Sequence, residues 1–288
     1  MSNIHLLIVD PQNDFCDIAP AEQPAHPLQP DARVAPALPV SGADADMKRL
    51  ARWIKDRLPQ ISQIHVTLDS HQPFDIAHPT FWRDAQGNRP AHMTTIGPGD
   101  IKAGRWSASD PEHRQRSLDY LEALERAGKR HMIWPEHCIV GTWGHNVHAH
   151  VAHALAGWSR QRGRDADYVF KGLNPMTEHF SAFEAEVVDP ADPATQYNEK
   201  LHRALAPADT LVIAGEALSN CVASTVRSLV ARLQASEIER IVLLTDCMSS
   251  VPGLEGIGRD FLTEMAAKGV KLATTETALA GESAKDLT

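Results

Sequence analysis

Short apolar runs alternate with amphipathic segments along most of the chain. Apolar residues dominate six runs, at residues 4–10, 62–69, 167–172, 209–215, 239–246 and 270–274. Between them, residues 46–58, 115–130, 220–235 and 258–269 place apolar side chains three and four positions apart, the spacing of an amphipathic helix. Strand followed by helix, repeated, predicts a mostly parallel sheet with helices on both faces.

The predicted strands are apolar at consecutive positions, as burial on both faces of a parallel sheet requires. The sequence therefore predicts an α/β fold, a three-layer α/β/α sandwich with a mostly parallel, Rossmann-like sheet. In such sheets ligands bind beyond the carboxyl ends of the strands. Chemically active side chains are expected where the strands end.

Three segments are longer than simple connections need to be, at residues 19–45, 72–130 and 140–166. The first is rich in Pro and Ala without periodicity and is predicted to be an irregular loop. We expect one domain over residues 1–288, with these segments as insertions. Loops of this length often act as lids or contacts between subunits, so a homo-oligomer is compatible with the sequence.

Composition and charge exclude several classes of partner. The 288 residues carry a formal net charge of −9, so the chain does not neutralise phosphates in bulk, and neither a nucleic acid nor an anionic membrane is expected as partner. No run approaches the roughly 20 apolar residues that cross a bilayer, and the amino terminus lacks a basic leader. We expect a soluble, cytoplasmic protein that acts on a small molecule.

The four cysteines are scattered, without a C-x-x-C pair, so disulfides are not expected. Cys16, Cys138 and Cys247 are interpreted as small buried hydrophobic residues. Cys221 differs because "IAGEALSNCVASTVRSL" places it at a strand-to-helix corner, in the first turn of the helix. The positive end of a helix stabilises a thiolate and an oxyanion alike, and the amides of Ala217 and Cys221 could converge on one oxygen.

Two charged residues end other predicted strands. Asp10 follows the first apolar run in "LLIVDPQNDFC", where it either faces a pocket or caps the next turn. Lys171 closes "DYVFKG" and either faces solvent or pairs with Asp10. In the second case it would also lower the pKa of a neighbouring thiol, since a nearby cation favours the thiolate.

A carboxylate and several imidazoles have the spacing of a metal site. Asp69 and His71 in "TLDSHQPFDIAHPTFW" face the same way in extended chain and can share one divalent ion, although surface histidines would also explain the pattern. His137 in "WPEHCIVGTWGHNVH" adds an imidazole, and whether His78 joins the site stays open. The remaining histidines of that region are interpreted as solvated or packed: His145, His148, His150 and His153.

Five stretches, "IVDPQNDFC", "LDSH", "WPEHCIVGTWG", "FKG" and "AGEALSNCV", together resemble the isochorismatase-like cysteine hydrolases, and among them most closely the nicotinamidases. The resemblance extends from residue 4 to about residue 275. It implies an isochorismatase-like sheet and a catalytic triad. The implied triad consists of Asp10, Lys171 and Cys221, with an oxyanion hole formed by Ala217 and Cys221.

The resemblance also implies a metal and a substrate. It places one divalent ion on Asp69, His71 and His137, with zinc expected first and iron or manganese as alternatives. The side chains of an aromatic slot for a pyridine ring would be Phe15, Trp134 and Phe180. The implied reaction converts nicotinamide and water into nicotinate and ammonia through a thioester, a step of NAD metabolism.

The segment before Cys221 departs from the family, since nicotinamidases usually have Thr-Asp there and this chain has Leu218, Ser219 and Asn220. One alternative is therefore a related cysteine hydrolase that acts on another amide or an imide. A second is a non-catalytic scaffold of the same fold with the Pro-rich loop as its binding surface. Six polar residues kept around one cavity argue against the scaffold, because clustered charges are costly to bury.

Overall fold

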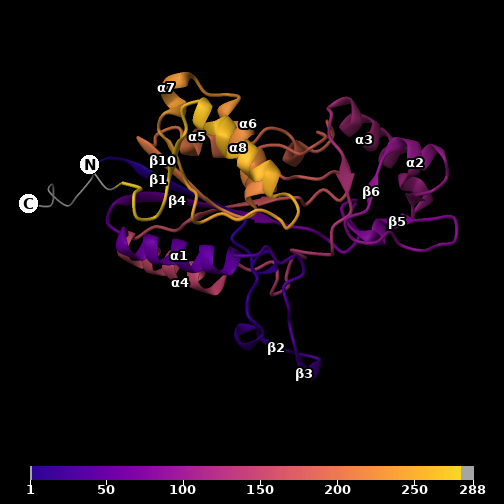
Figure 1. Ribbon diagram of the computed structural model, residues 1–288, viewed down its shortest axis with the longest axis horizontal. Helices are drawn as coiled ribbons and strands as arrows, with labels where there is room; N and C mark the ends of the chain where they lie inside the picture. Colours follow the sequence, from indigo (N-terminus) through magenta and orange to yellow (C-terminus); the bar gives the residue numbers. More distant parts are fainter. Residues whose placement is uncertain (1, 280–288) are drawn as a thin grey trace, which may run out of the picture.

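The computed structural model, which describes residues 2–279, is built around a six-stranded sheet (Figure 1). The strand order is β12-β11-β10-β1-β4-β9, and all neighbours are parallel. The strands are β1 (Ile4–Val9), β4 (Ile61–Asp69), β9 (Asp167–Lys171), β10 (Thr210–Gly215), β11 (Ile241–Leu244) and β12 (Lys271–Ala273). Each coincides with one of the six apolar runs, so the predicted parallel sheet is confirmed.

Helices cover both faces of this sheet (Figure 1). One face carries α1 (Ala43–Asp56) and α4 (Ala149–Arg162), and the other carries α5 (Glu199–Leu205), α6 (Ala223–Val230), α7 (Ala235–Ile238) and α8 (Glu255–Ala267). Strand β1 shows why its residues are all apolar: Leu6 and Ile8 belong to the core beneath α1 and α4, while Leu7 and Val9 belong to the opposite core. The predicted three-layer α/β/α architecture is confirmed.

The helix predicted over residues 220–235 is shorter than expected. A π-helical turn (η6, Leu218–Val222) precedes α6, and the chain leaves the helix after Ala231. Gln234 is extended, and its N–H donates to the Glu237 carboxylate at 2.9 Å, which starts α7 as a separate short helix. The apolar spacing continues across this break, so periodicity alone could not reveal it.

The long segments contain more regular structure than the sequence suggested. The expectation of an irregular loop over residues 19–45 was wrong at its centre, where β2 (Ala25–His26) and β3 (Gln29–Arg33) form an antiparallel ribbon. Two short 3₁₀ turns precede it, η1 (Asn13–Phe15) and η2 (Pro20–Glu22). The expectation missed the ribbon because its side chains are mostly exposed and carry no apolar alternation.

The segment from 72 to 130 forms a lobe at one end of the long axis of the molecule (Figure 1). Its apolar cluster includes Phe81, Trp82, Leu121 and Leu124. The elements in and beside it are η3 (Pro79–Phe81), β5 (Trp82–Arg83), β6 (Thr95–Ile96), α2 (Pro98–Lys102), β7 (Ser107–Ala108), η4 (Pro111–His113), α3 (Arg114–Arg126) and β8 (His131–Met132), and η5 (Pro193–Thr195) comes later in the chain. None of the helices within residues 2–279 is both long and apolar enough to span a bilayer.

Candidate active site

Strand register brings the candidate residues to one edge of the sheet. In the pairing of β4 with β9, Asp69 stands opposite Lys171, and in the pairing of β1 with β10, Val9 stands opposite Gly215. Asp10 follows Val9 directly. The carboxyl ends of four adjacent strands therefore present their polar residues to the same space, although these residues lie far apart in sequence.

The turn after β10 is held by its own backbone amides. Gly215 has a φ of 125°, and a Cβ there would run into the backbone of Val9, so only glycine fits. The N–H groups of Gly215, Glu216 and Leu218 donate to carbonyl oxygens of neighbouring segments at 3.0, 2.8 and 2.8 Å. The N–H of Ala217 has no hydrogen-bond partner within residues 2–279. It is thus free to donate to a ligand.

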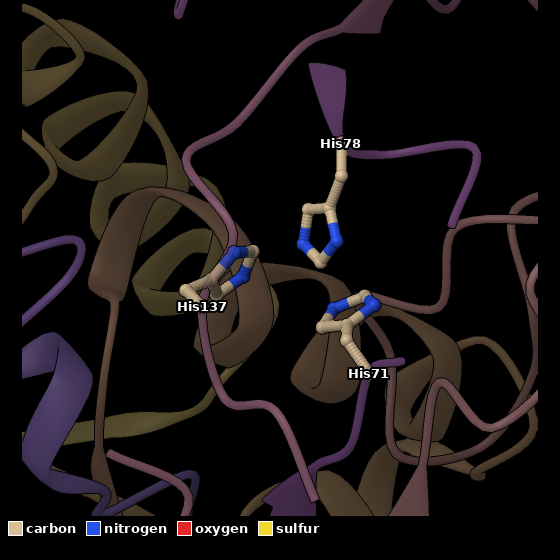
Figure 2. A group of neighbouring side chains, drawn as sticks. All are labelled: His71, His78 and His137. Carbon is tan, nitrogen blue, oxygen red and sulfur yellow. The ribbon is translucent and has the colours of Figure 1, made fainter. Parts of the chain in front are cut away.

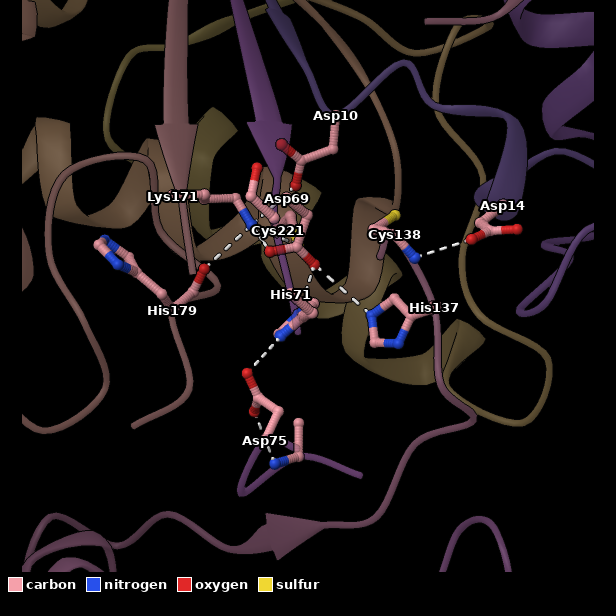
Figure 3. A network of polar contacts seen from close by, with 12 residues as sticks. Asp10, Asp14, Asp69, His71, Asp75, His137, Cys138, Lys171, His179 and Cys221 are labelled. Carbon is pink, nitrogen blue, oxygen red and sulfur yellow. Dashed lines mark hydrogen bonds and ion pairs between the residues drawn. The ribbon is translucent and has the colours of Figure 1, made fainter. Parts of the chain in front are cut away.

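Asp10, Lys171 and Cys221 form a buried cluster at this edge (Figure 3). The Lys171 Nζ lies 2.9 Å from Asp10 Oδ2, 2.9 Å from Asp69 Oδ1 and 3.6 Å from Cys221 Sγ. It also donates to the carbonyl oxygen of His179 at 3.0 Å. Sγ of Cys221 and one carboxylate oxygen each of Asp10 and Asp69 lie within 4.8 Å of one another.

Asp10 is further fixed by strand β4. Its backbone φ of 43° turns the chain out of the sheet direction, and its N–H donates to the hydroxyl oxygen of Thr67 at 3.0 Å. The same hydroxyl donates to Asp10 Oδ1 at 2.5 Å. The carboxylate is therefore held between Thr67 and Lys171, and no pattern in the sequence pointed to Thr67.

The two buried carboxyls differ in their electrostatic environment. Burial, reinforced by Asp69, raises the pKa of Asp10 although Lys171 opposes it. Burial would also raise the pKa of Asp69, but Lys171 and His71 outweigh it and hold that pKa well below its usual range. A carboxylate fixed in its charged form beside one that can accept a proton is a recurring division of roles in enzymes.

The thiol differs from expectation. Burial raises the pKa of Cys221 well above its ordinary value, and Asp10 adds to this, while Lys171 acts in the opposite direction. The sequence predicted a lowered pKa from the cation and the helix end. Lys171 does favour the thiolate as predicted, but burial outweighs it, so the net shift of the pKa is opposite to the prediction. Cys221 is also the fourth residue of the π-turn η6, not part of the first turn of α6.

Three histidines converge on one space beside this cluster (Figure 2). A ring nitrogen from each of His71, His78 and His137 lies within 4.8 Å of the others. In every ring Nδ1 faces an oxygen acceptor: Asp75 Oδ2 at 2.9 Å for His71, the Gln72 carbonyl at 3.2 Å for His78 and the Pro135 carbonyl at 2.8 Å for His137. Such partners require the hydrogen on Nδ1, which leaves the Nε2 lone pair of each neutral ring available.

The donor set fits a divalent metal ion. Asp69 Oδ2 lies 3.2 Å from His71 Nε2 and 3.5 Å from His137 Nε2, and His78 Nε2 is buried without a hydrogen-bond partner among the described residues. Histidine ligands of metals typically donate their other ring N–H to a carboxylate or carbonyl, as all three do here. Burial, then His137 and His71, lowers the pKa of His78 to about 3, which keeps it neutral as a ligand must be.

His71 has a competing state. Burial lowers its pKa, but Asp69 and Asp75 outweigh burial and raise it well above the usual range. Without an ion, the doubly protonated ring would donate its Nδ1–H to Asp75 and its Nε2–H to Asp69. An ion would displace the proton on Nε2, because metal binding to imidazole releases protons.

One pocket joins both halves of the site. Three of its lining residues were not predicted from the sequence: Leu38, which comes from the segment 19–45, and Asn220 and Val251. The predicted aromatic residues all line it, with Trp134 edge-on to Phe180 at 6.4 Å and Phe15 edge-on to His137 at 5.5 Å between ring centroids. The full lining is Phe15, Leu38, Asp69, Trp134, His137, Phe180, Ala217, Asn220, Cys221 and Val251.

The other candidate residues lie outside this site. His145 Nε2 lies 2.9 Å from the Ser70 hydroxyl, and His148 contacts Asp44 at 3.0 Å. His150 and His153 are exposed on α4.

The cysteines are all buried and unpaired: Cys16, Cys138, Cys221 and Cys247.

The sheet order, the flanking helices and the position of the site define an α/β protein of the isochorismatase-like fold. No protein-family model matches the chain, and no curated protein matches it by sequence. The chain does match solved structures by fold. A nicotinamidase/pyrazinamidase of Acinetobacter baumanii aligns at 19% identity over 96% of this chain and 97% of its own, with a TM-score of 0.59.

Two further structures show the same similarity. The yeast nicotinamidase Pnc1p bound to the inhibitor nicotinaldehyde aligns at 18% identity over 94% of this chain and 99% of its own, with a TM-score of 0.60. The pyrazinamidase of Pyrococcus horikoshii in complex with zinc aligns at 18% identity over the same shares, with a TM-score of 0.51. The fold that the sequence motifs implied is thereby confirmed.

Proposed function

We propose that the chain is a metal-dependent cysteine amidohydrolase that converts nicotinamide and water into nicotinate and ammonia. The observation that carries this proposal is the contact of Lys171 with Asp10, Asp69 and Cys221, the last two of which line a pocket together with His137. The similarity to a nicotinamidase that binds nicotinaldehyde supports the substrate. We further propose a cytoplasmic location for this activity.

The pocket suits a flat ring that carries a carboxamide. Phe15, Trp134 and Phe180 would hold the pyridine ring, with the carboxamide carbon beside Cys221 Sγ. A divalent ion on Asp69, His71, His78 and His137 would supply an anchor for the ring nitrogen, and zinc, iron and manganese all suit these nitrogen and oxygen donors. The zinc complex of a similar structure supports such a site.

Acylation uses the thiol and one acid. Asp10 accepts the thiol proton as Cys221 Sγ attacks the carboxamide carbon, which forms a C–S bond and moves one electron pair onto the oxygen. The N–H groups of Ala217 and Cys221 would stabilise this oxyanion. As the C–N bond breaks, Asp10 returns the proton to the nitrogen, ammonia leaves and a thioester remains.

Deacylation repeats these roles of Asp10 with water as the nucleophile. Asp10 takes a proton from water, whose oxygen attacks the thioester carbon, and the C–S bond breaks as Asp10 protonates the sulfur again. The product acid gives up its remaining proton to solvent and leaves as nicotinate, and the thiol is restored. Lys171 keeps its ammonium 2.9 Å from both carboxylates, which fixes Asp10 beside the sulfur through both steps.

The test is release of ammonia and nicotinate by the purified full chain, measured together with metal content and repeated after chelation and metal return. We expect turnover that falls on chelation and returns with the metal. Full activity in protein freed of metal would contradict the metal dependence. Metal binding without turnover of any amide would favour the non-catalytic scaffold.

A second candidate is hydrolysis of another amide or of an imide by the same residues. It is favoured by Asn220 and Leu38, which place an amide group and a side chain from the 19–45 segment in the pocket wall. A panel of pyridine and non-pyridine amides and cyclic imides distinguishes the two. A kcat/KM for any other substrate that exceeds that for nicotinamide by about tenfold, 1.4 kcal/mol of transition-state stabilisation, would replace the first proposal.

A further inference from the structure

Two buried acids meet behind the turn that carries the free Ala217 N–H. Glu216 is 0% exposed and Asp46 of α1 is 4% exposed. Ser249 connects them, since its N–H donates to Glu216 Oε2 at 3.1 Å and its hydroxyl donates to Asp46 Oδ2 at 2.5 Å. Arg49 donates to Asp46 Oδ1 at 3.1 Å. Neither acid belongs to the triad or to the histidine cluster.

Burial and the lack of a counter-ion indicate a proton on Glu216. Its Oε1 is buried without a hydrogen-bond partner among the described residues, and its Oε2 accepts the Ser249 N–H. No ion pair joins this carboxyl to a cation within residues 2–279, whereas Asp46 is paired with Arg49 at 3.1 Å. A buried carboxyl without a counter-ion is much more stable in its neutral form, so Glu216 is the acid that carries the proton.

We propose that Glu216 is a positioning residue whose protonated carboxyl fastens the turn at 215–218 to Ser249, and through Ser249 to α1, and keeps the Ala217 N–H directed at the pocket. The backbone N–H of Glu216 donates to the Val9 carbonyl of β1, and its side chain accepts from Ser249 in the loop after β11. The Ser249 hydroxyl in turn donates to Asp46 of α1, so three parts of the fold are joined directly beside Ala217. The catalytic consequence depends on the proposed function, while the protonation of Glu216 does not.

The surroundings make loss of this proton unfavourable. Burial, then Asp46, raises the pKa of Glu216 well above its ordinary value. The charged and titratable groups that face it are Asp46 and Arg49 on α1, Asp17 and Cys16 after β1, and Cys247 after β11. Deprotonation would place a second negative charge against Asp46 and loosen the turn, so the turn should weaken as pH rises.

Two variants of the full, metal-loaded chain test the proposal. Glu216→Gln keeps one donor and one acceptor but cannot ionise, whereas Glu216→Leu keeps the size and loses both. We expect Glu216→Gln to retain most of the turnover at neutral pH and to lack an alkaline decline that the unchanged protein shows. We expect Glu216→Leu to lose about 10- to 100-fold in kcat with little change in KM, because a displaced oxyanion donor affects the transition state.

Measurements without turnover separate this proposal from the proposed function. The thermal midpoint of the unchanged protein should fall relative to that of Glu216→Gln as pH rises above about 5, because the folded-state pKa exceeds the unfolded one. Amide hydrogen exchange at 215–218 should be faster in Glu216→Leu than in Glu216→Gln. Parallel midpoint curves would overturn the protonated pair, and equal exchange in the two variants would overturn the positioning role, whether or not nicotinamide is hydrolysed.

Discussion

Asp69 and Lys171 are register partners on adjacent parallel strands, and the Lys171 ammonium lies 2.9 Å from Asp69 Oδ1. The other oxygen of Asp69 faces His71 and His137, and the ammonium also contacts Asp10. A single carboxylate therefore belongs to both halves of the site. Any change that moves β4 against β9 would disturb the acid cluster and the histidine cluster together.

Removing the ammonium should destabilise the protein strongly. In Lys171→Met, Asp10 and Asp69 would remain buried and adjacent without their counter-ion, which typically costs about 3–5 kcal/mol. Urea unfolding measures the change in the free energy of unfolding. Lys102→Met breaks an ion pair whose lysine is 60% exposed and serves as control, with a much smaller expected effect. Equal effects of the two substitutions would contradict the buried ion-pair network.

Loss of the thiol should abolish turnover and leave the fold intact. In Cys221→Ala no C–S bond can form, so ammonia release should drop to the background rate while nicotinamide still binds, as measured by calorimetry. Cys247→Ala is the matched control, because Cys247 is also fully buried but does not line the pocket. Near-normal ammonia release by Cys221→Ala would remove the nucleophile assignment.

Asp75 should govern metal affinity without touching the ion. It accepts the Nδ1 hydrogen of His71 at 2.9 Å and the Ala77 N–H at 2.9 Å, which fixes the ring with Nε2 toward Asp69. Partners of this kind change metal affinity by about 10- to 100-fold when they are lost. Zinc titration of Asp75→Ala should show such a weakening.

The comparison for Asp75 is Asp84→Ala, because the hydrogen bonds of Asp84 within residues 2–279 all go to its own turn. This variant should bind zinc like the unchanged protein. Zinc affinity of Asp75→Ala equal to that of Asp84→Ala would show that the histidine cluster does not hold the ion.

The fold should lose stability in mild acid through buried neutral histidines. Burial lowers the pKa of His131 to about 4, below its ordinary 6.5. The contribution of the neutral His131 ring to the free energy of unfolding is fully present above pH 6.5 and is lost as pH falls toward 4. This loss is on the order of 3 kcal/mol. His131→Phe should have a flatter dependence of the free energy of unfolding on pH between 6.5 and 4. Identical slopes for the two proteins would show that His131 titrates normally.

The sequence predicted the sheet and the convergence at its edge for a physical reason. Strands β1 and β4 are mostly buried and lack charged residues before their ends, so Asp10 and Asp69 are visible as the first charged residues, whereas β9 is a half-exposed edge strand whose buried last residue is Lys171. Parallel order then brings their carboxyl ends together. The aromatic residues of the pocket were found through motif resemblance, because spacing alone does not distinguish a pocket aromatic from a core aromatic.

What the sequence missed depends on tertiary contacts. The state of the Cys221 thiol depends on complete burial, which no local pattern reports. Whether His78 belongs to the metal site could not be predicted, because its ring joins the cluster only through the path of residues 72–78. Leu38 was missed because it reaches the pocket from a segment without periodicity. Glu216, in the turn after β10, and Asp46 of α1 are connected through Ser249 only in the folded chain.

The three histidine rings are each tethered through Nδ1 to a protein oxygen, two of them to backbone carbonyls. Such a cradle is preorganised: its geometry comes from folding, and an ion would add little further ordering. Exchange of one metal for another should therefore leave the protein shape almost unchanged, and the choice of metal in the cell would follow supply and ligand chemistry more than conformational adjustment.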